Sequence, residues 1–130
     1  MHAGNVIKFA GLASLLAGLV MGSAAAFAHH SFAMFDRDKE MTVTGRVLRV
    51  DYANPHVWLT ITVVNANNEE EEWALEGGNL MGLYRAGWYK DTVKPGNEVT
   101  VALHPRADGD PGGSIMSVTQ ADGNVLRSGG

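Results

Sequence analysis

The sequence predicts a mainly β protein, a small five-stranded barrel with one short helix, behind a cleaved signal peptide. Three observations support this prediction. Short segments rich in valine and threonine show the two-residue alternation of half-buried strands. Turn residues separate these segments at short intervals. An uncharged apolar run near the N-terminus ends in small residues, as export signals do.

The export signal is predicted at residues 1–28. Phe9–Met21 is an apolar run of 13 residues after a short segment that contains Lys8. Ala26 and Ala28 form the A-x-A pattern at which signal peptides are cut. Because a helix needs about 20 apolar residues to cross a bilayer, we expect no stable membrane anchor. The mature chain is predicted to be periplasmic and to have 102 residues, enough for one small domain.

The first two strands are predicted at Met41–Tyr52 and Val57–Val64, joined by a turn at Asn54-Pro55. The first strand is rich in β-branched residues, and Gly45 inside it marks a bulge or bend. In the second strand, valine, leucine and isoleucine alternate with tryptophan and threonine, which predicts one buried face.

A third strand, Glu69–Glu76, returns after an asparagine-rich loop. The helix is predicted at Leu80–Ala86, with Asn79 as its N-cap and Gly87 just beyond its C-terminus. A tight turn at 94–97 leads into the fourth strand, Glu98–His104, and a loop rich in glycine and aspartate precedes the fifth.

The fifth strand is predicted at Ser114–Gln120. Five strands with a helix between the third and fourth is the element order of an OB-fold barrel, although an open sheet or a small sandwich has the same order. The predicted organisation is therefore a signal peptide at 1–28, an N-terminal arm at 29–40, a β domain at 41–124 and a flexible tail at 125–130.

Composition restricts the chemistry and the partners. The chain has no cysteine, which excludes disulfides, thiolate ligands and cysteine nucleophiles. Its net charge is −4, and removal of Lys8 with the signal makes it −5. Nucleic acid is a partner that needs a basic face, so the acidic balance predicts no nucleic-acid binding. A protein or a small molecule is the partner class that remains.

Five short segments of the mature chain are distinctive together: residues 29–32 (HHSF), 54–56 (NPH), 76–79 (EGGN), 85–88 (RAGW) and 121–123 (ADG). They resemble a family of small exported bacterial proteins of unknown function, whose mature chains begin with His-His-Ser-Phe. The resemblance covers the mature chain and implies a bacterial, periplasmic protein. It implies no activity.

Four histidines remain after cleavage: His29, His30, His56 and His104. A chain that begins at His29 offers an α-amine and an imidazole on one residue. His56 or His104 would add a third nitrogen, and three nitrogens in a T-shape suit tetragonal Cu(II). The histidines therefore predict a site for copper or another divalent metal, and a carrier or scavenger is the function that follows.

A second cleavage position leads to a related site. Cleavage after Ala26 would leave Phe27-Ala28-His29 at the terminus. A histidine in third position surrounds Cu(II) with an amine, two amides and an imidazole in a closed plane. The first arrangement leaves positions on the metal open for another ligand, whereas the closed plane of the second mainly holds the metal.

The competing interpretation needs no metal. An N-terminal histidine pair is then a polar start, His56 a turn residue, and His104 a solvent-facing strand end. The protein would be a binding module that holds a partner on its edge strands or on a face bearing Trp58, Trp73 or Trp88. No catalytic motif is present, so an enzyme is the least supported class.

Overall fold

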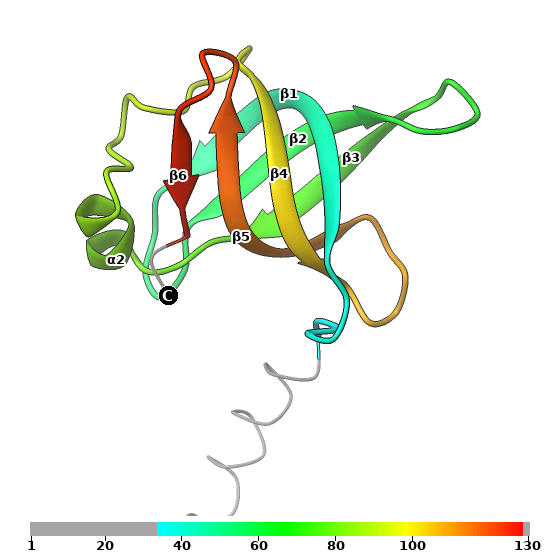
Figure 1. Ribbon diagram of the computed structural model, residues 1–130, viewed down its shortest axis with the longest axis horizontal. Coiled ribbons are helices and arrows are strands. Elements are labelled where there is room, and N and C mark those ends of the chain that lie inside the picture. Colours follow the sequence, from blue (N-terminus) through cyan, green and yellow to red (C-terminus); the bar gives the residue numbers. More distant parts are fainter. Residues whose placement is uncertain (1–33, 129–130) are drawn as a thin grey trace, which may run out of the picture. The chain divides into compact units, whose positions relative to one another are not determined.

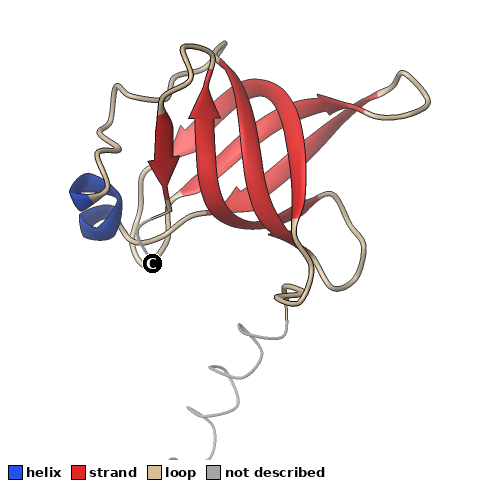
Figure 2. Ribbon diagram, viewed as in Figure 1, coloured by secondary structure: helices blue, strands red, loops and turns tan. Residues whose placement is uncertain are grey.

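Six β-strands and one short helix make up residues 34–128, the part of the chain that the computed structural model describes (Figures 1 and 2). In chain order they are β1 (Met41–Asp51), β2 (Trp58–Val64), β3 (Glu70–Glu76), α2 (Leu80–Arg85), β4 (Glu98–Pro105), β5 (Gly112–Gln120) and β6 (Val125–Arg127). Within these residues no helix is long and apolar enough to cross a membrane.

The first five strands close into a barrel. β1 pairs antiparallel with β2 and with β4, β2 pairs with β3, and β4 pairs with β5. A short parallel pairing of β3 with β5, from Ala74–Gly112 to Glu76–Ser114, joins the two ends of the sheet. This connectivity is that of an OB-fold barrel. The predicted fold class, five strands with a helix between the third and fourth, is confirmed (Figure 1).

β1 serves two neighbours because it bends around the barrel. At Arg46 it is paired both with Thr62 on β2 and with Glu98 on β4. Gly45 precedes this point, and a Cβ there would overlap the backbone carbonyl oxygen of Thr62. The glycine predicted to mark a bend therefore lies where two backbones approach each other closely.

The alternating apolar residues of the strands fill the barrel. Leu59, Ile61, Leu75, Val101 and Leu103 are each 0% exposed, and most of their sequence neighbours are more exposed, although Thr60 is buried at 3%. Burial of such side chains supplies most of the favourable free energy of folding.

Helix α2 contributes one buried leucine to this core. Asn79 caps the helix, since its side chain accepts a hydrogen bond of 2.8 Å from the Gly82 amide. Leu83 and Trp88, in and just beyond the helix, are 1% exposed and pack in the core cluster. The predicted N-cap and the predicted position of the helix are both confirmed.

The end of the chain departs from the prediction of a flexible tail at 125–130. Val125–Arg127 form β6, which pairs antiparallel with Ser117–Thr119 of β5. Leu126 is buried in the core at 3% exposure. A three-residue strand has no periodicity of its own, so only its long-range pairing identifies it.

The N-terminal side of the barrel is anchored before β1 begins. Phe35 and Arg106 form an isolated β-bridge, the Asp36 amide donates to the Pro105 carbonyl at 2.8 Å, and the Ala107 amide donates to the Met34 carbonyl at 2.9 Å. The predicted signal peptide, 1–28, and the first part of the predicted arm, 29–33, lie outside the described residues. The later part of that arm is paired with the end of β4.

Candidate metal centre

His104 lies near the end of β4, on the outside of the barrel. Its neighbour Leu103 points into the core, so the alternation of the strand turns the imidazole outward. The ring is half-buried, and its Nδ1 is 2.8 Å from the carbonyl oxygen of Lys39, just ahead of β1.

This contact fixes the tautomer of the His104 ring. A carbonyl oxygen can only accept, so Nδ1 carries the proton and donates it to Lys39. In the neutral imidazole, Nε2 then carries a lone pair, and no hydrogen bond occupies it within residues 34–128. Metal-binding histidines are usually oriented in this way, with one ring nitrogen donating to an oxygen and the other on the metal.

His56 lies in the loop between β1 and β2, two residues after Asn54. Its Nδ1 contacts Oε1 of Glu76, the last residue of β3. The Glu76 side chain is only 14% exposed, whereas that of His56 is 42% exposed. A carboxylate on Nδ1 leaves Nε2 facing solvent, so this ring too is oriented by an oxygen acceptor.

The two described histidines belong to separate places on the barrel. His104 is paired across the sheet with Ser114, and Ser114 is paired with Glu76, the partner of His56. Two strand spacings put the backbones of His104 and Glu76 about 10 Å apart. Among residues 34–128, no group of three or more His, Cys, Asp or Glu side chains is placed to hold a metal. His29 and His30 lie outside the described residues, so a site that includes them is a proposal.

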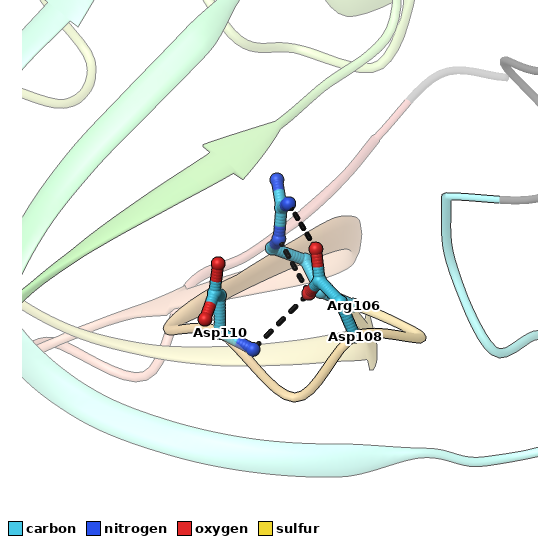
Figure 3. Close-up of polar contacts among 3 residues, drawn as sticks. All are labelled: Arg106, Asp108 and Asp110. Atoms are coloured by element: carbon cyan, nitrogen blue, oxygen red, sulfur yellow. Dashed lines mark hydrogen bonds and ion pairs between the residues drawn. The ribbon is translucent and has the colours of Figure 1, made fainter.

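The loop between β4 and β5 is hydrogen-bonded to Met34, ahead of β1. Polar contacts among its own residues Arg106, Asp108 and Asp110 hold its shape (Figure 3). Nε of Arg106 donates to Asp108 at 2.9 Å, and a second guanidinium nitrogen contacts the other carboxylate oxygen. The Asp110 amide donates to the same carboxylate at 3.1 Å. The hydrogen bonds from Arg106 lower the pKa of the Asp108 carboxyl. The two contacts between Arg106 and Asp108 stabilise one conformation of the loop. In that conformation the Ala107 amide of the loop donates to the Met34 carbonyl.

Sequence reasoning missed the partners of both histidines. Lys39 is 65 residues from His104, and Glu76 is 20 residues from His56. Neither pair has a local spacing that would reveal it. The local sequence feature that precedes Lys39 is an aspartate turn: the Asp36 side chain accepts from the Asp38 amide two residues later. Such a spacing predicts the turn but not its contact with His104.

The tryptophans do not form an exposed face. Trp88 is buried, and Trp58 and Trp73 are half-buried. The indole N–H of Trp73 is buried and has no hydrogen-bond partner within the described part of the chain. Tyr84 and Tyr89 are the exposed aromatic pair, with their rings stacked at a centroid distance of 5.9 Å. Among residues 34–128 the exposed aromatic pair is therefore Tyr84 and Tyr89, in and just after α2, whereas Trp58 and Trp73 are only partly exposed.

One solved structure that resembles this chain is the mitochondrial single-stranded DNA-binding protein Rim1 of S. cerevisiae. The TM-score is 0.46 with 15% sequence identity, and the match covers 70% of this chain and 97% of that one. No curated protein matches the sequence.

The prediction that nucleic acid is not a partner is corrected, because the net charge on which it was based does not support that exclusion. The physical reason is that net charge is a sum over the chain and does not describe any one face. Arg46 and Arg49, for example, are both exposed on β1 although the chain is acidic overall. The acidic balance therefore does not exclude this class of partner.

The family comparison supports the coarser part of the resemblance noted in the sequence, membership of a family of unknown function. The model of a family of unknown function, DUF6152, matches residues 16–116. This range includes most of the barrel and both described histidines. The chain belongs to the DUF6152 family.

Proposed function

We propose that this protein is exported to the periplasm and there binds Cu(II) as a carrier or scavenger. After cleavage behind Ala28, His29 supplies its α-amine and one ring nitrogen, and His104 supplies Nε2. The observation that carries the proposal is the hydrogen bond from His104 Nδ1 to the Lys39 carbonyl, 2.8 Å long. It leaves Nε2 as a lone-pair donor on a ring that cannot turn freely.

The length of the arm is compatible with this pair of ligands. Met34 is held against Ala107, three residues beyond His104. A strand rises about 3.3 Å per residue, so this anchor is about 10 Å along the chain from His104. The five residues from His29 to Met34 span up to about 17 Å when extended. The length of the arm therefore permits the pair of ligands that we propose.

The ligand chemistry favours copper over harder metals. Three nitrogen donors without a thiolate suit Cu(II), which prefers tetragonal nitrogen sites and ranks highest among the divalent first-row metals. His56, with its carboxylate partner, is the alternative source of the third nitrogen. If cleavage falls after Ala26 instead, the amine, two amides and His29 close the plane, and His104 is not needed.

Native mass spectrometry of the untagged protein, exported in bacteria supplied with copper, tests the proposal. We expect a chain that starts at His29 with one copper ion. His29→Ala and His104→Ala should each weaken Cu(II) binding at least about tenfold, and His56→Ala serves as the matched control. Electron paramagnetic resonance should show three nitrogen couplings, one of which is lost in His104→Ala.

The other outcomes separate the alternatives. A copper-loaded chain that starts at Phe27, and whose copper binding is unchanged by His104→Ala, would indicate the closed plane of four nitrogens. If His56→Ala weakened copper binding and His104→Ala did not, the third ligand would be His56, in the loop between β1 and β2. A mature chain that retains no metal would contradict the proposal.

A second candidate function is a metal-free binding module, and it is favoured by the Tyr84–Tyr89 stack. Two exposed, stacked rings offer a flat apolar surface on which a planar ligand can pack. Binding of a planar naphthalene dye would test it. The dye should bind the wild type and Tyr84→Phe, which keeps the stack, but not Tyr84→Ala. Equal binding by all three would exclude this surface.

A further inference from the structure

A tight turn at residues 36–39 precedes β1, and the side chain of Asp36 organises it. One carboxylate oxygen accepts from the Asp38 amide at 3.3 Å, and the other lies 2.8 Å from Nζ of Lys39. The backbone closes the same turn, because the Lys39 amide donates to the Asp36 carbonyl at 3.2 Å. Asp36 thus holds both the main chain and the side chain of Lys39.

The same turn is fastened to the end of β4. The Asp36 amide donates to the Pro105 carbonyl at 2.8 Å, one residue from His104. The Lys39 carbonyl in turn accepts from His104 Nδ1. The turn and the strand end therefore make two hydrogen bonds to each other, one through each end of the turn. The pKa of the Asp36 carboxyl is lowered, mainly by the hydrogen bond from Lys39, and His104 also contributes.

We infer that Asp36 is a positioning residue for His104. Asp36 holds the turn and thereby directs the Lys39 carbonyl at Nδ1. This contact keeps the ring in the Nδ1–H tautomer and leaves the Nε2 lone pair available to a metal. The importance of this tautomer for copper rests on the proposed function, but the tautomer itself is a property of the metal-free protein. Sequence spacing does not suggest this role, because Asp36 and His104 are 68 residues apart.

Nitrogen-15 NMR of the metal-free protein tests the inference directly. Long-range ring correlations distinguish Nδ1–H from Nε2–H at about pH 8.5, above the range in which histidines in proteins usually titrate. In the wild type, His104 should be in the Nδ1–H form. In Asp36→Ala the Nε2–H form should become a major species, because the Lys39 carbonyl is no longer held in place.

Three variants keep this test independent of misfolding. Asp38→Ala removes an exposed carboxylate from the same turn and should leave the tautomer unchanged. Asp36→Asn keeps an oxygen for the Asp38 amide but loses the charge, so it should be intermediate. Lys39→Met removes only the ion pair and keeps the carbonyl, so it should stay closer to wild type than Asp36→Ala. The amide spectra of the barrel strands report whether each variant is folded.

A copper titration of the mature protein then separates this inference from the proposed function. Loss of an orienting partner should weaken binding about 10- to 100-fold in Asp36→Ala and leave Asp38→Ala unaffected. A changed tautomer with unchanged copper affinity would support the role of Asp36 and argue against His104 as a ligand. A folded Asp36→Ala that keeps the Nδ1–H form, or a wild type in the Nε2–H form, would overturn the inference.

Discussion

The hydroxyl group of Tyr52 has several hydrogen-bond partners far away in the sequence. The Tyr52 hydroxyl donates to the Lys90 carbonyl at 3.1 Å and accepts from the indole N–H of Trp88 at 3.3 Å. It thereby connects the end of β1 to the segment after α2 and satisfies a polar atom of a buried tryptophan. Partial burial raises the pKa of the Tyr52 phenol, so the hydroxyl keeps its proton in alkaline solution.

Tyr52→Phe should lower the free energy of unfolding by about 1–3 kcal/mol, because it leaves the Trp88 N–H buried without an acceptor. Urea denaturation at neutral pH measures this change. The matched control is Tyr89→Phe. Because Tyr89 is 59% exposed, removing its hydroxyl should leave the free energy of unfolding nearly unchanged. Equal effects of the two substitutions would contradict the bridging role of Tyr52.

At the scale of elements, the barrel depends on strands whose two faces have different surroundings. In β6 this difference occurs between adjacent residues, since Leu126 is buried in the core whereas Val125 is 54% exposed. β6 has only three residues and pairs only with β5 among the described strands. Its contribution to stability should therefore come mostly from one side chain.

Leu126→Ala should destabilise the protein by about 2–5 kcal/mol, the usual cost of a cavity at a buried leucine. Val125→Ala, its neighbour on the opposite face, should change stability by no more than about 0.5 kcal/mol. Thermal and urea unfolding of the two variants provide the comparison. If both were neutral, β6 would not be part of the cooperative unit.

At the scale of the whole molecule, two ion pairs hold the segments at one end of the barrel. Asp36 pairs with Lys39 ahead of β1, and Asp108 pairs with Arg106 between β4 and β5. The pKa of each carboxyl is lowered, first of all by the side-chain hydrogen bond from its cationic partner. Both pairs are exposed to solvent, so their individual contributions are small.

These pairs make a signed prediction for acid. A carboxyl whose pKa is lower in the folded state contributes stability above its unfolded value, 3.8, and this contribution is lost as the pH falls below it. The double variant Asp36→Asn/Asp108→Asn should therefore lose less stability than the wild type between about pH 5 and about pH 2. Urea denaturation across this range measures both slopes. If the variant lost more stability than the wild type over this pH range, the lowered pKa values of the two carboxyls would be contradicted.

Much of the fold could be predicted because it is encoded locally. Alternation in Val57–Val64 identified a strand, although Thr60 on its other face is buried as well. The asparagine at 79 and the glycine at 87 delimited the helix. The role of Gly45 was only partly predictable. A glycine suggested a bend, but the reason, an approach of the Thr62 backbone, comes from another strand.

The candidate site could be predicted only as a set of residue types. The sequence identified His56 and His104 as possible nitrogen donors, but not Glu76 or Lys39, whose oxygen atoms orient them. Those partners come from β3 and from the turn before β1. Their proximity follows from strand order and register, which side-chain periodicity does not specify.

The sequence by itself determined the number of barrel strands, the place of the helix and the apolar face of the second strand, because these follow from alternation, capping and turn chemistry. Only the tertiary structure decided the closure of β3 on β5, the pairing of β6, and which nitrogen of each described histidine is left open. These features depend on contacts between segments distant in the chain. A periodic pattern reports that one face of a strand is buried, but not which neighbour buries it.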